Sequence, residues 1–564
     1  MSSGDLFSQL DMAKRSLSAQ QAALSVAGHN IANLNNEGYS RQRADLEEQH
    51  PRRAALGTGV DIGGVERITD RFTNLRLIGE QSRLGNLDMR EKIMLKLEQI
   101  YNETEGSGLR ATLNEFWDAW GHVANEPESE LHRSELITKA NLVTRKFAEM
   151  AHDLSNLRTE LNNRISRDVE EINQLAQSLA KQNTNVQQTD RNKGEANDIK
   201  DEREAVLKKL SKLVAIEWFE DENKLIQVTI GNGWPLVAGR RANHIEASLK
   251  SDEPGYFRLR GVDPQGISRD ITDELRGGQT QELFELRDKT VLKFQDKLDE
   301  LAAEIAFKVN QQHASGTGLN ARYTRLRSSF ALKPDAVFKP LPFLKDGTFR
   351  VHMVNESNEI LESYEVKVRS GEDNVRDVVS RINEAVGEEG IFRAALNDDG
   401  TVTLESTGPY PFILGSDDTD FAVMMGFNNF FEVLHGARDI AVNPRLAKEP
   451  NFISAGKDLV PGDNSVALAI HALQFQPTMA DDSITFDEFH NGVLAELGLI
   501  VQRSQTEKRS QELIVDQFQR LRNEISSVSM DEEVADMVQH QRGFDAAAKF
   551  VTTVDDMTKT IIDM

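Results

Sequence analysis

The sequence of 564 residues contains no cysteine. Disulfides, zinc–thiolate sites and thiol catalysis are therefore excluded. Aromatic residues make up only 6% of the chain, so its hydrophobic cores must rest on aliphatic side chains and alanine. Long apolar runs are also missing: none approaches the ~18 residues of a membrane span. The first residues, Met1 to Phe7, lack the basic and apolar regions of a cleaved secretory signal.

Positive charge is in short supply as well. The chain carries 66 basic against 91 acidic residues, which gives a formal net charge of −25. Phosphate-rich partners require a basic surface, so this balance argues against binding to nucleic acid. Anionic membrane surfaces attract polybasic segments, and the same balance argues against a membrane partner.

Heptad-like patterns occupy both ends of the chain. Residues 5–34 are predicted to form one amphipathic helix, which ends in an Asn-rich stretch before Gly38. A last helix is predicted to start at Met530 after a serine-rich break. Apolar residues follow three-four spacing in both helices. The N-terminal seam reads Leu6, Leu10, Ala13, Leu17, Leu24, Ala27, Ile31, with Gln20 in the missing slot; the C-terminal seam reads Met537, Phe544, Ala547, Val551, Val554, Ile561, with His540 and Thr558 in the remaining slots.

The middle of the chain predicts a multidomain α+β protein: a terminal α-helical coiled-coil pair, a long helical bundle shaft and an inserted β-rich outer domain. Residues 67–214 carry helical periodicity, including a pattern from 129 to 188 that is too long for an ordinary globular helix. Alternating residues and a Gly-Asn-Gly turn predict a small β segment. The predicted domains are 1–66 with 527–564, containing a β-ribbon loop; 67–314 with 484–526, including the β segment at 214–277; and an α+β domain at 315–483.

The two terminal helices are predicted to pack together. Burying the five large side chains of the first seam contributes roughly 10 kcal/mol, whereas ordering about 30 residues costs roughly 1–2 kcal/mol per residue. One seam therefore does not hold such a helix rigid. We expect both ends to be mobile in the isolated monomer and to become ordered on assembly.

Candidate chemistry is sparse. His29, His122, His132, His313 and His540 show no metal-ligand spacing and are expected to be solvated. No phosphate loop and no nucleophile elbow is present, so we expect no enzyme, no catalytic residue, no cofactor and no metal. The pairs Asp398-Asp399 and Asp481-Asp482 are interpreted as turn chemistry, the glycines at 57, 59, 63 and 64 as breaks between extended pieces, Phe116, Trp117 and Trp120 as core, and the Lys and Arg of the long helices as a solvated face.

A family resemblance adds to this reading. The segment from Leu6 to Arg43 contains the run Asn-Ile-Ala-Asn followed by Gly-Tyr-Ser-Arg-Gln, and it resembles the N-terminal motif of flagellar axial proteins. That family usually has Thr-Pro before the Gly-Tyr, where this chain has Asn36-Glu37. The stretch from Val528 to Met564 is similar to the family's closing helix. The helical region after Arg67 resembles the hook-associated proteins of the hook–filament junction.

This resemblance implies a structural junction role for a ring of subunits between hook and filament. It implies export through the flagellar type III pathway without a cleaved signal, and hence an extracellular location in the bacterial flagellum. The implied partners are further copies of the chain, the hook protein, a second hook-associated junction protein and an export chaperone. The implied assembly interface is Leu6, Leu10, Leu17, Leu24, Ile31, Asn33, Gly38, Tyr39, Met537, Phe544, Val551, Val554 and Ile561; the implied chaperone-binding residues are Met537, Phe544, Val551, Val554 and Ile561.

Two alternatives remain at this point. Another axial protein, from the hook or the distal rod, would have mostly strands in residues 70–215. A secreted enzyme or adhesin would have a deep pocket with converging titratable groups in residues 315–483.

Overall fold

The computed structural model describes residues 3–36, 38–48, 59–103, 106, 108–189, 196–251, 255–319, 322–333, 344–388, 390–457, 460 and 462–562. The side chains of Leu6 and Ile561, and the whole of Gly57, lie outside the described residues. Two compact units are present: the first contains residues 1–94, 159–288 and 502–564, and the second contains residues 95–158 and 289–501. The residue ranges of the two units divide α2 (Arg71–Ile100), α4 (Glu130–Thr189) and α12 (Phe486–Ser526), so each of these helices contributes residues to both.

Long helices dominate the first unit. The part of α4 within it buries Leu161, Ile165, Val169 and Ile172, whose three-four spacing places them on one face. The other helices of this unit are α1 (Ser3–Ala32), α5 (Asn197–Leu213), α6 (Gly278–Glu285) and α13 (Met530–Ile562), with a short 3-10 turn at Thr272–Glu274 and a π-helical segment at Leu286–Thr290.

Small antiparallel sheets complete the first unit. The predicted alternation in Ile226–Ile230 is confirmed, since Ile226, Val228 and Ile230 are buried, and a turn with Gly231 and Gly233 at positive φ follows. The strands are β1 (Gln42–Glu48) with β2 (Val60–Arg67); β3 (Ile216–Glu220), β4 (Ile226–Ile230), β5 (Trp234–Ala238) and β6 (Arg241–Ala242), in that order; and β7 (His244–Leu249), β8 (Phe257–Val262) and β9 (Ser268–Asp270).

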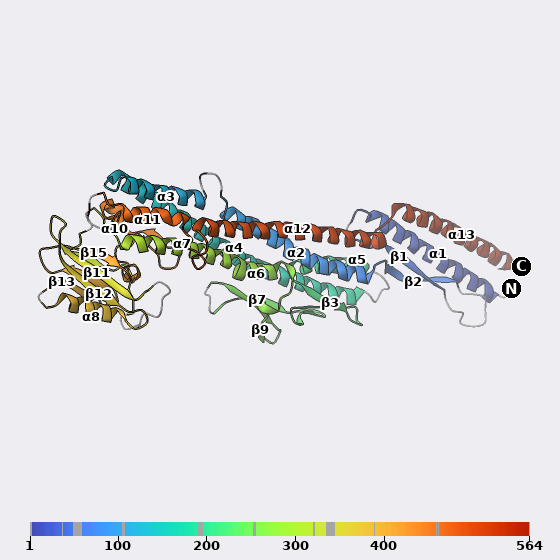
Figure 1. Cartoon of the computed structure of the whole chain (residues 1–564). Coiled ribbons are helices and arrows are strands. Elements are labelled where there is room, and N and C mark those ends of the chain that lie inside the picture. Colours follow the sequence, from blue (N-terminus) through green and yellow to red (C-terminus); the bar gives the residue numbers. More distant parts are fainter. Residues whose placement is uncertain are drawn as a thin grey trace. The chain divides into compact units, whose positions relative to one another are not determined.

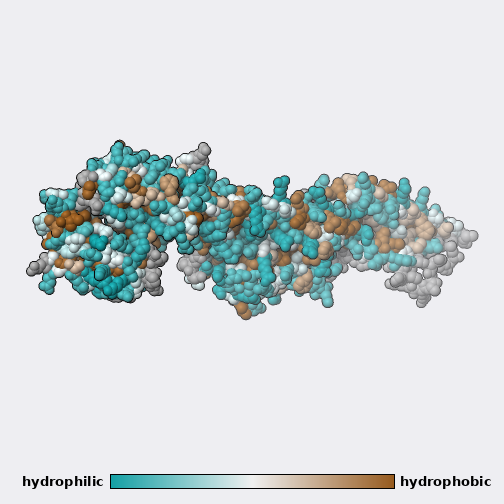
Figure 2. All heavy atoms as spheres, viewed as in Figure 1, coloured by the Kyte–Doolittle hydropathy of each residue, from teal (hydrophilic) through white to brown (hydrophobic). Residues whose placement is uncertain are grey.

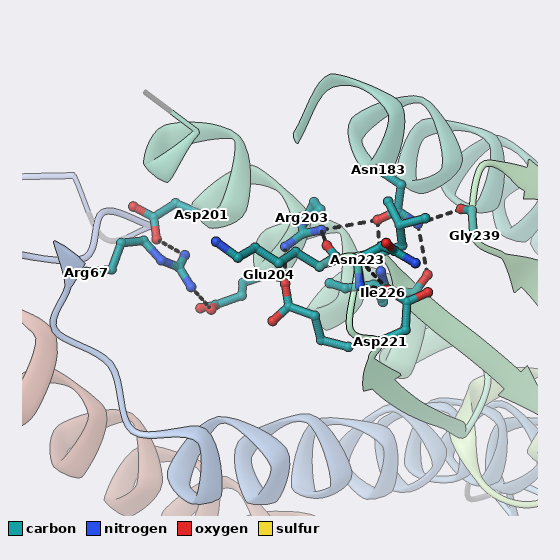
Figure 3. A network of polar contacts seen from close by, with 12 residues as sticks. Arg67, Asn183, Asp201, Arg203, Glu204, Asp221, Asn223, Ile226 and Gly239 are labelled. Atoms are coloured by element: carbon teal, nitrogen blue, oxygen red, sulfur yellow. Dashed lines mark hydrogen bonds and ion pairs between the residues drawn. The ribbon is translucent and has the colours of Figure 1, made fainter. Parts of the chain in front are cut away.

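Buried asparagines on α4 attach these sheets to the helix. The Asn183 amide donates to the carbonyls of Ile226 (2.8 Å) and Gly239 (2.6 Å), and its Oδ1 accepts from Ile226 N (Figure 3). Asn173 holds Ile245 in the same way through both backbone groups. Each of these asparagines pairs with both the N–H and the carbonyl of one strand residue, so each helix–sheet contact has a defined register.

The second unit combines helices with two three-stranded sheets. Their orders are β10-β14-β13 and β12-β11-β15, and all pairings are antiparallel. Its helices are α3 (Leu109–Asn125), α7 (Val291–Ala314), α8 (Val375–Val386), α9 (Phe421–Met425), α10 (Pro444–Lys448) and α11 (Ser465–Ala472), with 3-10 turns at Pro450–Phe452 and Leu473–Phe475. Its strands are β10 (Arg325–Arg327), β11 (Gly347–Val354), β12 (Ile360–Val368), β13 (Phe392–Leu396), β14 (Val402–Ser406), β15 (Phe412–Asp417), β16 (Phe431–Glu432) and β17 (Ala441–Val442).

One expectation about histidine is wrong. His313 is fully buried beside Trp120 and Phe430, where its Nδ1 lies 2.8 Å from the carbonyl of Asn428 and its Nε2 accepts from Ser454 N at 2.9 Å. Burial lowers the pKa of His313 to about 4, so the ring is neutral at pH 7. The sequence pattern could not separate this histidine from solvated ones, because its hydrogen-bond partners come from distant segments.

The expectation that arginines of the long helices are solvated also fails in places. Arg133 of α4 is 1% exposed, and its guanidinium donates to the carbonyls of Pro127 (3.0 and 2.6 Å) and Ile453. Arg203 of α5 is buried beside Asn183. The aromatic residues expected in the core, Phe116, Trp117 and Trp120, are buried as predicted. Taken together, the helices and small sheets confirm the multidomain α+β fold class.

Candidate assembly interface at the paired terminal helices

The first and last helices form an antiparallel pair. α1 and α13 pack along their lengths, and both chain ends lie at the same end of the pair (Figure 1). Gln20 meets His540, with 2.8 Å between Oε1 and Nδ1, and Asn30 meets Glu533. Residue numbers thus rise along one helix as they fall along the other.

Alanines line the buried side of α1. Ala13, Ala19, Ala23 and Ala27 are each at most 3% exposed, and α1 is covered by α13 on one side and by the β1–β2 ribbon on another. Small side chains allow these elements to approach closely. The close approach is visible at Gly543, where an added Cβ would lie 2.9 Å from the Gln20 side chain.

The larger residues expected at the interface are only partly covered within the chain. Leu10 remains 38% exposed. On α13, only Val554 is fully buried among the expected residues with described side chains. The half-buried members are Leu17, Leu24, Ile31, Asn33, Met537, Phe544 and Val551.

The polar residues that interrupt the two apolar seams contact each other. Gln20 and His540 each interrupt a heptad pattern, and they form a hydrogen-bonded pair inside the helix–helix contact. A polar pair at such a position fixes register and orientation, because any other alignment leaves both groups buried without partners. Sequence reasoning noted both gaps but did not pair them.

A polar cluster lies where α1 ends, built from Asn30, Tyr39, Arg41, Gln42 and Glu533. Asn30 exchanges two hydrogen bonds with the backbone of Gln42, at 2.8 and 3.0 Å. The Tyr39 hydroxyl donates to Asn30 Oδ1 at 2.7 Å. All of these residues except Glu533 belong to the Asn-Ile-Ala-Asn and Gly-Tyr-Ser-Arg-Gln runs of the sequence, so the motif folds the chain back onto α1.

A buried carboxylate closes this cluster from α13. Glu533 is 2% exposed, and its two oxygens accept from Asn30 Nδ2 (2.9 Å) and Arg41 Nε (2.7 Å). Arg41 also pairs with the exposed Glu532 and, at 3.3 Å, with Asp536. The Arg41 backbone N–H donates to the carbonyl of Ser526 at 2.8 Å. The N-terminal motif is thereby fastened to both sides of the break between α12 and α13.

The cluster continues into α5. Asp201 accepts from the Ser40 backbone N–H at 2.9 Å and from Arg67 at 2.6 Å, while Arg67 also reaches Glu204 at 2.6 Å (Figure 3). Burial raises the pKa of Asp201, against the opposing effect of Arg67. Burial, and after it the carboxylates of Asp198 and Asp201, also raises the pKa of Tyr39, so its hydroxyl stays protonated and donates.

Gly38 lies at the turn of the motif. It is exposed, and its backbone N–H donates to Asn36 Oδ1 at 3.2 Å. Asn33 completes the end of α1, since its side chain donates to the carbonyl of His29 at 3.0 Å. Both residues therefore shape the chain reversal, and Tyr39 is buried behind them.

An apolar stripe stays uncovered on α12 and α13. On α12, Ile514, Leu521 and Ile525 are seven and four residues apart, and on α13, Met530, Val534 and Val538 are four apart, which places each set on one helix face. Figure 2 shows hydrophobic residues along this part of the chain. We call them the exposed stripe: Leu513, Ile514, Leu521, Ile525, Met530, Val534, Val538, Phe550 and Met557, each at least 37% exposed.

Comparison with known proteins places these features in context. Residues 94–325 match the model described as the flagellar hook-associated protein FlgK helical domain. Residues 521–564 match the C-terminal region of the flagellar basal body rod proteins FlgEFG, and residues 10–39 match the flagella basal body rod protein.

Flagellar hook-associated proteins are similar to this chain over nearly its full length. The chain is 25% identical to flagellar hook-associated protein 1 of Bacillus subtilis over 99% of this chain and 98% of the relative. It is 24% identical to the protein of the same name from Escherichia coli, over 99% and 100%. The solved structure of the flagellar hook junction protein FlgK from Burkholderia pseudomallei has a similar fold, with a TM-score of 0.52 at 14% identity, covering 80% of this chain and all of that one.

Proposed function

We propose that the paired terminal helices of this chain, a structural protein of the flagellar hook–filament junction that is similar over its full length to flagellar hook-associated protein 1, form the contact through which it polymerises at the hook tip. The mostly helical region from 71 to 213 does not favour a hook or distal-rod protein. The subunits form a ring that connects the hook to the filament.

The exposed stripe carries this proposal. After α1 and α13 have packed against each other, large apolar residues such as Ile525, Val534 and Val538 still face water. Contiguous exposed apolar surface marks an interaction site in a folded protein. Covering such side chains contributes about 1 kcal/mol each, and a neighbouring terminal pair of the same chemistry is the occupant that polymerisation supplies.

Specific partners are a further part of the proposal. The chain assembles into the flagellar axis with other flagellar proteins. We assign the hook protein to one side of the ring and a second hook-associated junction protein to the other. The net charge of −25 argues against nucleic acid and anionic membrane surfaces as partners. No helix in the described part of the chain has the length and apolar content that crossing a bilayer requires.

Export precedes assembly in this proposal. The protein leaves the cell through the flagellar pathway and acts outside it, and a chaperone holds Met537, Phe544, Val551, Val554 and Ile561 before export. Val554 is 1% exposed in the folded pair. The chaperone and α1 therefore compete for the same face of α13, and the pair forms only after the chaperone has left.

A catalytic role is not part of the proposal. A groove of about 730 Å³ in the second unit is lined by Lys345, His352, Asp417 and Asp420 among others. Asp417 accepts from the N–H groups of Thr419 and Ala422, and Asp420 pairs with Lys345 at 3.3 Å. These carboxylates cap turns and balance charge, so the groove does not present a base aimed at a nucleophile.

The three-part division predicted from the sequence stands as part of the proposal. Residues 1–66 and 527–564 form the axial contact, residues 67–314 and 484–526 the shaft, and residues 315–483 an inserted domain. The first of these parts is the one through which subunits meet.

Deletion of the gene tests the proposed function. The strain should build a normal hook and lose filament subunits to the medium, and the full chain supplied in trans should restore the filament. A hook that is absent or altered in length would contradict the junction role.

Two α13 variants separate assembly from export. Val538→Glu lies in the exposed stripe and should be exported and bound by the chaperone, yet fail to restore the filament. Gln539→Glu, its exposed neighbour, is the matched control and should restore it. Val554→Glu should lose both chaperone binding and assembly. Normal filaments with Val538→Glu would refute the stripe as the subunit contact.

A further inference from the structure

Two histidines and a carboxylate meet at the turn between α3 and α4. His122 lies in the last turn of α3, and His132 and Glu135 lie near the start of α4, three residues apart. Glu135 Oε2 is 3.5 Å from His122 Nδ1 and 3.5 Å from His132 Nδ1. All three candidate ligand atoms lie within 4.8 Å of one another.

This geometry is close to that of a bound metal ion. In a tetrahedral zinc site with bonds of about 2.0–2.2 Å, neighbouring ligand atoms are separated by roughly 3.3–3.6 Å. Two of the separations already have this value. Closing the third requires small rotations of side chains that are partly exposed, 51% for His122, 25% for His132 and 38% for Glu135.

A second carboxylate supports one of the ligands. Glu126 Oε2 lies 3.5 Å from His132 Nε2, the ring nitrogen that faces away from Glu135. Metal-binding histidines usually donate their outer N–H to a carboxylate, which fixes the ring and strengthens the ligand. Exposed histidine–carboxylate pairs also occur without any metal. Here three candidate ligands converge, and Glu126 lies beside the outer ring nitrogen of one of them.

We propose that His122 Nδ1, His132 Nδ1 and Glu135 Oε2 bind one divalent transition-metal cation of the zinc type, with Glu126 as a positioning residue. Imidazole nitrogens favour such ions, whereas calcium and magnesium favour all-oxygen sites. Three protein ligands leave a fourth position for water. The ion joins the end of α3 to the start of α4 and so stabilises their connecting turn.

The sequence does not reveal this site through ligand spacing. His122 and His132 are ten residues apart, and they become neighbours because the chain reverses between Asn125 and Glu130. Their ring centroids are 5.5 Å apart.

Titration of the metal-free full chain with Zn²⁺ tests the proposal. Calorimetry should show one site per chain whose affinity falls at least about 100-fold in His122→Gln/His132→Gln. The variant Glu126→Gln, which keeps all three ligands, should lose about 10-fold or more. Cobalt should give the visible absorption of a low-symmetry tetrahedral site in the wild type, and the double variant should lack it.

His435 provides the matched control. It lies 2.6 Å from Asp439 on the surface as a simple histidine–carboxylate pair, so His435→Gln should leave Zn²⁺ binding unchanged. Circular dichroism checks that each variant is folded. Equal Zn²⁺ affinity in the wild type and in the double variant, or an equal loss in His435→Gln, would overturn the site.

Discussion

Arg41 neutralises the buried carboxylate of Glu533 between the two terminal helices. Replacing it by methionine keeps most of the side-chain volume and removes the guanidinium that bonds Glu533 Oε1 at 2.7 Å. Glu533 is 2% exposed, so its carboxylate is left with the Asn30 amide as its remaining partner among the hydrogen bonds described above. Breaking a buried pair from one side costs about 3–5 kcal/mol. Since 1.4 kcal/mol is a factor of ten, the pair should open at least about 100-fold more often.

Hydrogen exchange measured by mass spectrometry follows this opening, because amides in the first turns of α13 exchange only when the pair separates. The control is Glu532→Gln, which removes a 62%-exposed partner of the same arginine and should cost at most about 1 kcal/mol. The double variant Arg41→Met/Glu533→Gln should recover much of the loss, because no charge remains buried. Equal exchange in Arg41→Met and Glu532→Gln would refute the reasoning.

Three further predictions concern both units. Burial lowers the pKa of His313 to about 4, below the ~6.5 of an unfolded histidine, so the unfolded state binds more protons between these two pH values. The free energy of unfolding should therefore fall by up to about 3 kcal/mol as the pH drops through this window. Urea unfolding of His313→Gln should show a shallower decline with falling pH. Asn183→Leu should lower the free energy of unfolding, measured by calorimetry, by about 3 kcal/mol, because it removes the side chain that pairs with backbone groups of Ile226 and Gly239. The control Asn185→Ala, on the same helix, should change that free energy by about 0.5 kcal/mol or less. Gln20→Leu should raise exchange in α1 by leaving His540 without its 2.8 Å partner, and Gln20→Leu/His540→Leu should reverse that effect; if the single variant is as protected as the wild type, the polar pair does not set the register.

Helix positions and fold class could be predicted from the sequence because they depend on local periodicity. The predicted last helix begins at Met530, where α13 begins. The predicted start of the first helix differs from Ser3 by two residues, as frayed ends allow. The pairing of the two ends also followed from the matching seams.

Distant partners were beyond such reasoning. Glu533 is one acidic residue among several at the start of α13, and nothing in its neighbourhood marks it as buried. Its partners Asn30 and Arg41 lie about five hundred positions earlier. For the same reason, the burial of His313 and Arg133 was missed. Their partners are mainly backbone groups, which carry no sequence signal.

The buried face of α1 shows a different limit of prediction from sequence periodicity. Periodicity weights large apolar residues, so it selected Leu10, Leu17 and Leu24. The structure buries four alanines on this side of α1: Ala13 and Ala27, which the seam included, and Ala19 and Ala23, which it did not. Close approach of three elements favours such small side chains. The leucines on the flank of this face are thereby left available for other contacts.

The antiparallel pairing of α1 with α13 makes the molecule sensitive to its own completeness. A chain that is delivered from its N-terminus gains α1 of this pair first and α13 last. Glu533 and His540 reach Asn30 and Gln20 only when more than nine-tenths of the 564 residues have been delivered. A chain truncated near its end would keep nearly all of its folded mass and still lack the joining surface, so the fold itself distinguishes finished subunits from unfinished ones.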